Sequence, residues 1–207
     1  MNKTKNISVL FLDIGGVLLT NGWDGDMRRS AAEKFGLDYD EMNERQNLVY
    51  EAYERGLITL AEYLGKVVFH RKRKFPPGQF IKYMFSMSRP FNESIELFKK
   101  LAKTHLLKVA AVNNEGRELN DYRISKFHLS ELIEFFISSC FVHLRKPDEA
   151  IYRLALDIAR VSPQEVLYID DREFFVEVAA GLGINAIYHQ DIEKTRRAIA
   201  RFGFEMY

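Results

Sequence analysis

The chain has 207 residues, of which 47% are hydrophobic and 29% are charged, and its formal net charge is +1. These values are ordinary for a soluble globular protein with one large domain, or with one domain and an insert. The near-neutral charge favours neither a nucleic acid nor a membrane as partner. The single cysteine, Cys140, excludes a disulfide framework and a thiolate zinc cage within the chain. We expect a reducing, cytoplasmic location, and the N-terminal residues predict no signal peptide and no membrane span.

The first predicted element is a buried strand in the segment VLFLDIGGVLL, which starts at Val9. This strand ends on a carboxylate, Asp13. Gly15 and Gly16 follow, and they allow a tight backbone turn that exposes carbonyl and amide groups to a ligand. A charge at the end of a buried strand, beside such a turn, makes Asp13 the first candidate for a chemical role.

Residues 20–90 predict a helical insert without strands. Three amphipathic segments indicate helices: DMRRSAAEKFGL, DEMNERQNLVYEAYERG and TLAEYLGKVVFHRKR. The proline-rich segment KFPPGQF predicts a turn. We therefore expect residues 1–19 and 91–207 to form the core domain and residues 20–90 to form an inserted helical domain. The basic residues 70–75 are interpreted as a solvated helix end, with a clamp for an anionic substrate as the alternative.

From residue 92 onward, helical and apolar segments alternate. Helices are predicted in NESIELFKKLAK, GRELNDYRISKF, PDEAIYRLALDIAR, EFFVEVAAGLG and DIEKTRRAIARFG, and strands in LLKVAAV, IEFFISSCF, EVLYID and INAIYH. Short apolar strands that alternate with helices are typical of a parallel sheet with helices on both faces. The predicted fold class is therefore α/β, with a helical insert after the first strand.

Polar side chains stand at, or just beyond, the ends of four predicted strands. They are Asp13, Asn113 with Asn114, Lys146, and Asp170 with Asp171. Ligands bind beyond the carboxyl ends of parallel strands, so we expect these side chains to converge. Carboxylates so close together repel one another unless a cation lies among them, which favours a hard divalent ion such as Mg²⁺. A lysine beside a metal ion suits a phosphate group.

The same segments resemble a known family. In order along the chain, FLDIGGVL, AVNNEG, RKPDEAIY and YIDDRE are similar to the motifs of the haloacid dehalogenase superfamily, in the branch with a helical cap after the first motif. The segment YERGLITLAEYL is similar to one in sugar-phosphate phosphatase-like members and in the N-terminal phosphatase domains of soluble epoxide hydrolases. The resemblance covers nearly the whole chain and implies a Rossmann-like core with a helical cap domain.

The resemblance also implies a nucleophile and a metal site. Asp13 would attack phosphorus and form an aspartyl-phosphate, which water would then hydrolyse. Mg²⁺ would be held by Asp13, the backbone carbonyl of Gly15 and Asp171, with Asp170 bound directly or through water. The expected function is a Mg²⁺-dependent phosphatase that acts on small phosphorylated metabolites.

The phosphoryl group has its own implied ligands. Asn113, Asn114 and Lys146 would hold its oxygens, and Lys146 would also balance charge in the transition state. The turn at Gly16 would present backbone groups to the same phosphate. The resemblance predicts a serine or threonine where Asn113 stands, but the amide of an asparagine can also donate to a phosphoryl oxygen.

A second departure is chemical. Most phosphatases of the family carry an aspartate two residues after the nucleophile, as general acid and base, and here that position is Gly15. General acid catalysis contributes about 10²–10⁴-fold to rate, so another group would have to protonate the leaving oxygen. Asp24 and Asp26 are candidates for this role because both follow the first strand.

Two other functions stay open at this point. A carbon–halogen hydrolase of the same superfamily also uses an aspartate nucleophile, and it needs no acid at position 15 because halide leaves unprotonated. It needs no metal either, so the adjacent Asp170 and Asp171 favour the phosphatase. A phosphate-binding or regulatory protein without turnover is the alternative from another class, and the replacements at Gly15 and Asn113 fit it.

Overall fold

The computed structural model describes residues 6–204. Residues 1–5, part of the N-terminal stretch for which no signal peptide is predicted, and residues 205–207 lie outside the described range. Five parallel strands form one sheet in the order β3-β2-β1-β4-β5. They are β1 (Val9–Leu12), β2 (Lys108–Asn113), β3 (Phe135–Ser138), β4 (Val166–Asp170) and β5 (Asn185–Tyr188). This strand order is Rossmann-like and confirms the predicted α/β class.

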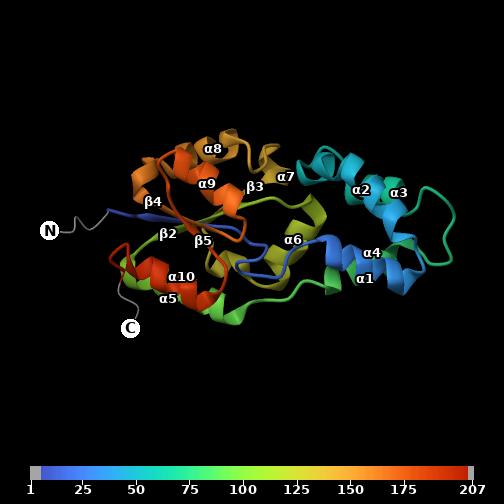
Figure 1. Ribbon diagram of the computed structural model, residues 1–207, viewed down its shortest axis with the longest axis horizontal. Helices are drawn as coiled ribbons and strands as arrows, with labels where there is room; N and C mark the ends of the chain where they lie inside the picture. Colours follow the sequence, from blue (N-terminus) through green and yellow to red (C-terminus); the bar gives the residue numbers. More distant parts are fainter. Residues whose placement is uncertain (1–5, 205–207) are drawn as a thin grey trace.

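Helices cover both faces of the sheet (Figure 1). One face carries α5 (Asn92–His105), α6 (Arg117–Lys126) and α10 (Ile192–Ala200), and the other carries α8 (Glu149–Ala159) and α9 (Glu173–Gly181). Alternate residues of β1 join different apolar clusters. Leu10 and Leu12 pack on the α5 side, whereas Val9 and Phe11 pack on the α8 side. Because both faces are covered, the whole strand is apolar, and its first polar residue comes where the sheet ends.

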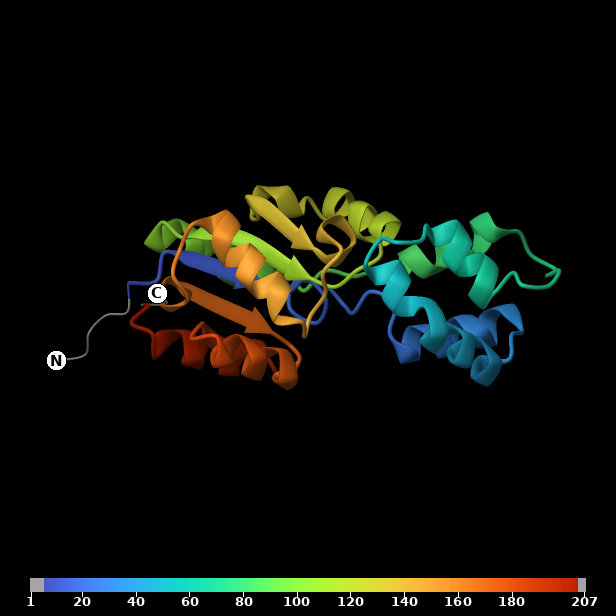
Figure 2. The same cartoon turned by 90° about the horizontal axis from the view of Figure 1, so that it is seen from above.

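Four helices lie between β1 and α5 in the sequence. They are α1 (Gly25–Phe35), α2 (Tyr39–Glu54), α3 (Leu60–Val67) and α4 (Pro77–Ser86). They share an apolar cluster, which Leu119 of α6 also joins, and in it Tyr63, Phe80 and Met84 are almost completely buried. We call residues 25–86 the helical lobe. Figure 2 shows the lobe beyond the tips of the strand arrows, at the carboxyl edge of the sheet.

The predicted domain boundaries at residues 19–20 and 90–91 stay a prediction. Within residues 6–204, none of the helices has the length and hydropathy needed to cross a bilayer.

Three local predictions are wrong. Residues 70–73 do not continue the preceding helix, because α3 ends at Val67. The carbonyl of the next residue, Val68, accepts a hydrogen bond from Nε of Arg73 instead of from a further turn of helix. The segment predicted as a proline-rich turn contains the start of α4, since proline is well suited to the first helical position. Residues 139–142 form the short helix α7 (Ser139–Val142) instead of extending β3, because neighbouring β2 ends and leaves Ser138 as the last paired residue.

Candidate active site

Asp13 lies at the middle of the carboxyl edge of the sheet. Its strand, β1, pairs with β2 on one side and with β4 on the other. The backbone N–H of Asp13 donates to the carbonyl of Ile169 at 2.9 Å, which extends the pairing with β4 by one residue. Its carboxylate Oδ1 accepts a hydrogen bond from the backbone N–H of Ile14 at 2.8 Å. The side chain is therefore held at the point where the chain's strand order reverses, which is where ligands bind in such sheets.

Lys146 joins the carboxylates of two different strands. Its Nζ lies 3.1 Å from Oδ1 of Asp13 and 2.5 Å from Oδ2 of Asp170. Only 1% of this lysine is exposed. Burial lowers the pKa of Lys146, but the nearby carboxylates of Asp13 and Asp170 raise it by more. The net pKa lies above the usual value for lysine, so the ammonium group stays charged.

Asp170 is completely buried, and both of its carboxylate oxygens have partners. Oδ2 accepts from Lys146 and from the hydroxyl of Tyr168, and Oδ1 accepts from the backbone N–H of Arg172 at 2.8 Å. This arrangement makes Asp170 the group that fixes the position of Lys146.

Asp171 is different, because its Oδ1 is buried and has no hydrogen-bond partner among residues 6–204. Carboxylate oxygens of Asp13, Asp170 and Asp171 lie within 4.8 Å of one another. Burial, together with Asp170, raises the pKa of Asp171. Burial raises the pKa of Asp13 to about 7, with Asp170 and Asp171 adding to the rise and Lys146 opposing it. Three carboxylates with one lysine leave negative charge without a partner, and this set of hard oxygen ligands fits Mg²⁺.

The two glycines after Asp13 differ in whether their surroundings leave room for a Cβ. Gly16 has φ +73°, and a Cβ there would lie 2.1 Å from Oδ2 of Asp171, so only glycine fits against this carboxylate. Gly15 has no left-handed φ, and a Cβ there would lie 3.3 Å from Oδ1 of Asn21. A Cβ at position 15 therefore requires only a small shift of Asn21.

The two predicted phosphate-binding asparagines have different surroundings. Asn114 accepts from the backbone N–H of Lys146 at 2.9 Å and donates to the Lys146 carbonyl at 2.8 Å. The side chain of Asn113 instead donates to Asn120 at 3.0 Å and accepts from Oγ of Ser138 at 2.7 Å. Asn114 lines the cavity at the sheet edge, and Asn113 is not among the residues that line it. Asn120 and Ser138 carry no local sequence signal for such a role, because neither follows the end of a predicted strand.

A cavity of about 360 Å³ lies over Asp13 and Gly15, between the sheet edge and the helical lobe. Its volume falls in the range of small-molecule sites. Cationic side chains that sequence reasoning did not select also line it: Arg28, Arg123, Arg145 and Arg172. They are far apart in the sequence and form no motif, so only the fold brings them together.

The other candidates from the sequence lie as follows. Asp24 lines the cavity, and its Oδ1 accepts from the backbone N–H of Met27 as the N-cap of α1. Asp26 is not among the lining residues. In the basic segment 70–75, His70 and Arg71 both contact Glu41 of α2, and no residue of this segment lines the cavity. An anion clamp from this segment at the cavity is therefore not supported.

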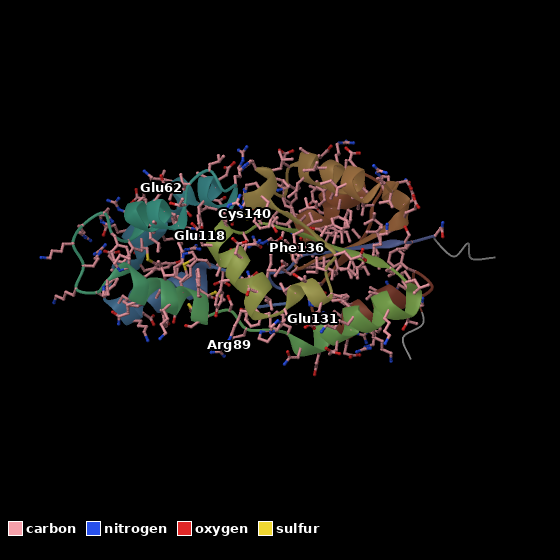
Figure 3. The ribbon with its side chains drawn as sticks, turned by 180° about the vertical axis from the view of Figure 1, so that it is seen from behind. Glu62, Arg89, Glu118, Glu131, Phe136 and Cys140 are labelled. Carbon is pink, nitrogen blue, oxygen red and sulfur yellow. The ribbon has the colours of Figure 1, made fainter. Side chains whose placement is uncertain are left out.

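The helical lobe is bonded to the sheet layer at several points. Oγ of Ser139 donates to the carbonyl of Glu54 at 2.6 Å, and Nη2 of Arg145 lies 2.7 Å from the Glu54 carboxylate. The backbone N–H of Leu60 donates to Glu118 at 2.8 Å. Glu118 and the neighbouring Cys140 lie at the junction between the lobe and the sheet layer (Figure 3). These contacts hold the lobe over the cavity.

A buried ion pair also holds the segment that leads from β1 into the lobe. Arg123 pairs with Glu115, and its Nη2 donates to the carbonyl of Thr20 at 2.5 Å. A Cβ at Gly22 would lie 2.2 Å from the Glu115 carboxylate, so this segment runs directly against the pair. Burial raises the pKa of Glu115, and Arg123 opposes the rise.

Comparison with protein families finds one match that covers most of the chain. The model for "haloacid dehalogenase-like hydrolase" matches residues 7–183. Bifunctional epoxide hydrolase 2 of Mus musculus is 28% identical over 200 residues, which are 87% of this chain and 36% of that protein. The chain thus spans little more than a third of the length of that relative. Flavin mononucleotide hydrolase 1 of Arabidopsis thaliana is 22% identical over 207 residues, with 100% of this chain and 82% of that protein covered.

Solved structures share the fold. A HAD family enzyme from Bacteroides thetaiotaomicron superposes with a TM-score of 0.80 at 23% identity, with 93% of this chain and 100% of that chain covered. A structure of that enzyme in complex with magnesium and inorganic phosphate gives a TM-score of 0.76 at 22% identity, with coverage of 89% and 96%. L-2-haloacid dehalogenase from Xanthobacter autotrophicus, with chloropropionic acid covalently bound, gives 0.61 at 16% identity, with coverage of 97% and 85%.

Proposed function

Because this chain belongs to the family of haloacid dehalogenase-like hydrolases, we propose that it is a Mg²⁺-dependent phosphatase acting on small phosphate monoesters. One observation carries the proposal: three carboxylates lie within 4.8 Å of one another, and the buried Oδ1 of Asp171 has no partner among residues 6–204. A buried carboxylate oxygen without a donor is costly, and a hard cation removes that cost. The family and the hydrolase class are properties of the chain, whereas the metal, the substrate and the residue roles are proposed.

The proposed first step is an attack by Asp13 on phosphorus. Oδ1 of Asp13 already accepts from Ile14 and lies beside Lys146, so Oδ2 is the oxygen left to attack. A bond forms between Oδ2 and phosphorus, and the ester P–O bond breaks with its electron pair on the leaving oxygen, which then takes up a proton from water. In the second step, water attacks phosphorus, the P–O bond to Asp13 breaks, and inorganic phosphate leaves.

Lys146 is proposed to hold the transferring phosphoryl group. Its Nζ is 3.1 Å from the nucleophile and is buried, so its charge acts in a site from which water is largely excluded. Asn114 holds the backbone of Lys146 through two hydrogen bonds, and Asp170 holds its ammonium group. We assign these two residues to positioning, and Gly16 stays a predicted phosphate contact. We do not propose Asn113 as a phosphate contact, because its amide is bonded to Asn120 and Ser138 and it does not line the cavity.

Mg²⁺ would be held by Asp13, Asp171 and the backbone carbonyl of Gly15, with Asp170, which also binds Lys146, reached directly or through water. When bound, the ion supplies positive charge to the phosphoryl oxygens as negative charge accumulates there. The magnesium and inorganic phosphate complex of the Bacteroides thetaiotaomicron enzyme supports this choice of metal. The substrate is proposed to be a phosphorylated metabolite that fits a cavity of about 360 Å³, and the cytoplasmic location stays a prediction.

Position 15 restricts which esters are hydrolysed well. Gly15 supplies no acid, and the carboxylate of Asp24, which lines the cavity, is bonded to the start of α1. The leaving oxygen therefore departs with little help. We expect aryl, acyl and anomeric sugar phosphates, whose leaving groups are stable anions, to react faster than simple alkyl phosphates.

A carbon–halogen hydrolase is the second candidate. Gly15 favours it, because a departing halide needs no proton, and the fold is also shared with L-2-haloacid dehalogenase. The cluster of three carboxylates favours the phosphatase, since it suits a metal ion. A phosphate-binding protein without turnover is the third candidate.

One experiment separates the three candidates. The purified protein is incubated with p-nitrophenyl phosphate, with acetyl phosphate and with a panel of sugar phosphates, each with Mg²⁺ and with EDTA. Phosphate release that depends on Mg²⁺ is the expected result. Metal-independent halide release from 2-chloropropionate would instead identify a dehalogenase. Phosphate binding in calorimetry without release of phosphate or halide would identify the non-catalytic protein.

A further inference from the structure

The charged side chains around the cavity are unevenly balanced. Three of the lining cations have carboxylate partners: Lys146 with Asp13 and Asp170, Arg123 with Glu115, and Arg145 with Glu54. Arg28 and Arg172 also line the cavity, and neither has a carboxylate within 4.0 Å among residues 6–204. Arg28 and Arg172 are therefore the two lining cations that have no carboxylate partner in the described part of the chain, and Asp24, which also lines the cavity, has no ion-pair partner either.

Arg28 is the more restrained of these two arginines. Its Nη1 donates to the carbonyl of Trp23 at 2.5 Å, and its Nη2 donates to Oδ1 of Asn43 at 3.0 Å. Both acceptors are neutral. The remaining Nε is buried and has no hydrogen-bond partner in the described part of the chain. A guanidinium group fixed by neutral acceptors keeps its charge and a free N–H, which are the two features that bind a carboxylate or a phosphate.

The neighbours of Arg28 on α1 add no carboxylate and little bulk beside its guanidinium group. Gly25 precedes it by one helical turn, and a Cβ at Gly25 would lie 3.9 Å from Nη2 of Arg28. A side chain at position 25 would thus contact the guanidinium group. Asp24, one helical turn before Arg28, caps α1 through the backbone N–H of Met27, and neither Asp24 nor Asp26 forms an ion pair with Arg28. Both Gly25 and Asp24 line the same cavity.

Arg172 contributes positive charge from the opposite side. It precedes α9 on the sheet layer, its Cζ lies 5.8 Å from the ring centroid of Phe175, and it is exposed. Arg28 belongs to the helical lobe, so the two unpaired arginines belong to different walls of the cavity. An anionic group that enters between these walls gains attraction from both of them.

We propose that Arg28 binds a second anionic group of the substrate, a carboxylate or a second phosphate, while the transferable phosphoryl group lies at Asp13. The inference rests on the proposed function for the place of the first phosphoryl group. It narrows the substrate class to small phosphate esters with two anionic groups. Arg28 is a specificity residue, and Arg172 adds attraction at longer range.

The test uses pairs of compounds that differ only in the second charge. One pair is 3-phosphoglycerate and glycerol 3-phosphate, and the other is glucose 1,6-bisphosphate and glucose 1-phosphate. The preference is the ratio of kcat/KM within each pair. We expect the wild-type protein to prefer the doubly anionic member of at least one pair, and Arg28→Gln to reduce that preference by about 10–100-fold, the range that hydrogen bonds to charged groups give. The pair with the larger preference tells whether the second group is a carboxylate or a phosphate.

The chain offers a matched control in Arg29. It lies next to Arg28 on α1, but its Cζ is 4.1 Å from the ring centroid of Tyr39, and it does not line the cavity. Arg29→Gln removes the same charge from the same helix and should leave the preference unchanged. Arg28→Lys keeps the charge and loses the planar fork, so it should retain part of the preference.

Binding measurements separate this inference from the proposed function. The four compounds are titrated calorimetrically into Asp13→Asn protein, with and without Arg28→Gln. Tighter binding of a doubly anionic compound that is lost with Arg28→Gln supports the inference, even if no phosphate ester is hydrolysed and the proposed function fails. Equal affinities within both pairs, or a preference that Arg28→Gln leaves intact, would overturn the inference even if the phosphatase activity is present.

Discussion

The two walls of the cavity differ in which charged groups lack a partner. The sheet wall is formed by lining residues from 13–15 and 114–175, and the lobe wall by lining residues from 21–54. On the sheet wall, Lys146 is buried between Asp13 and Asp170. Oδ1 of Asp171 is buried beside them and has no hydrogen-bond partner in the described part of the chain. On the lobe wall, Arg28 is fixed by neutral acceptors and keeps its charge unpaired. The buried carboxylate oxygen without a partner on one wall suits a cation, and the unpaired guanidinium group on the other suits an anion. The comparison indicates that the sheet wall performs the chemistry and the lobe wall selects the substrate.

The walls also differ in how they are built. The catalytic candidates of the sheet wall stand at or near strand ends, where ladder hydrogen bonds and backbone N–H groups fix them. The residues of the lobe wall stand on helices and on the segment that leads into them. They reach the cavity through interactions such as those of Arg145 with Glu54. Substitutions on the sheet wall should therefore affect every substrate, and those on the lobe wall should affect some substrates more than others.

The largest effect is expected for the nucleophile. Asp13→Asn should lower phosphatase turnover by about 10⁴-fold or more, because a neutral amide cannot attack phosphorus. The loss should be the same for aryl and for sugar phosphates, as the comparison of the walls requires. Steady-state kinetics of both substrate types checks this, with circular dichroism as the control for folding. A loss confined to one substrate type would contradict the assignment of chemistry to the sheet wall.

A large loss of stability should follow when the buried lysine is removed. Lys146→Met leaves Asp13 and Asp170 buried without their cation, which typically costs about 3–5 kcal/mol. Arg145→Met is the matched control, because it breaks a partly exposed ion pair with Glu54 that is worth about 0–1 kcal/mol. Urea unfolding of both variants without metal measures the difference. Equal costs for the two variants would mean that burial does not distinguish the pairs.

Restoring the missing acid should change the choice of leaving group. Gly15→Asp should raise kcat/KM for alkyl phosphates more than for aryl phosphates, by up to about 10²–10⁴-fold. The backbone at Gly15 has no left-handed φ, and a Cβ there fits with a small shift of Asn21. Gly16→Ala is the contrasting variant: its Cβ would overlap the Asp171 carboxylate, so it should lose activity on all substrates. If wild-type protein already hydrolyses both ester types equally well, another acid is present, and Asp24 is the first to replace.

The smallest effect is a pH dependence of stability. The pKa of Asp13 in the folded, metal-free protein is raised to about 7, above its value in the unfolded chain. Ionisation of Asp13 therefore destabilises the fold as pH rises from about 4 to about 7. Asp13→Asn should raise the Tm of the metal-free protein relative to wild type at pH 8, and by less at pH 4.5. Mg²⁺ should reduce the difference at pH 8, and a Tm difference that grows as pH falls would have the wrong sign.

The fold and the convergence at the sheet edge could be predicted because both depend on local patterns. Apolar runs that end on Asp13, Asn113 or Asp170 are visible in the sequence, and parallel pairing then brings their ends together. The direction of a side chain could not be predicted in this way. Asn113 ends its strand as predicted, yet its amide bonds to Asn120 and Ser138. Their partnership depends on how α6 packs, which no local pattern contains.

The lobe wall was the less predictable part. Arg28 lies in a predicted helix, but nothing near it in the sequence shows that it lacks a carboxylate partner, because that depends on which elements fold against α1. The start of α4 was hidden by its prolines, which indicate a turn and a helix start equally well. Charge balance in a cavity is a property of tertiary structure, and only the folded chain reveals it.

The proposed covalent intermediate on Asp13 can be tested directly. The protein is mixed with ³²P-labelled acetyl phosphate, with Mg²⁺ or with EDTA, quenched in acid within milliseconds to seconds, and digested for peptide mapping. The account predicts acid-stable label on the peptide that contains Asp13, formed only with Mg²⁺ and absent from Asp13→Asn, which should also release no phosphate. Label on a different residue, or release of phosphate by Asp13→Asn at a rate near that of the wild type, would contradict it.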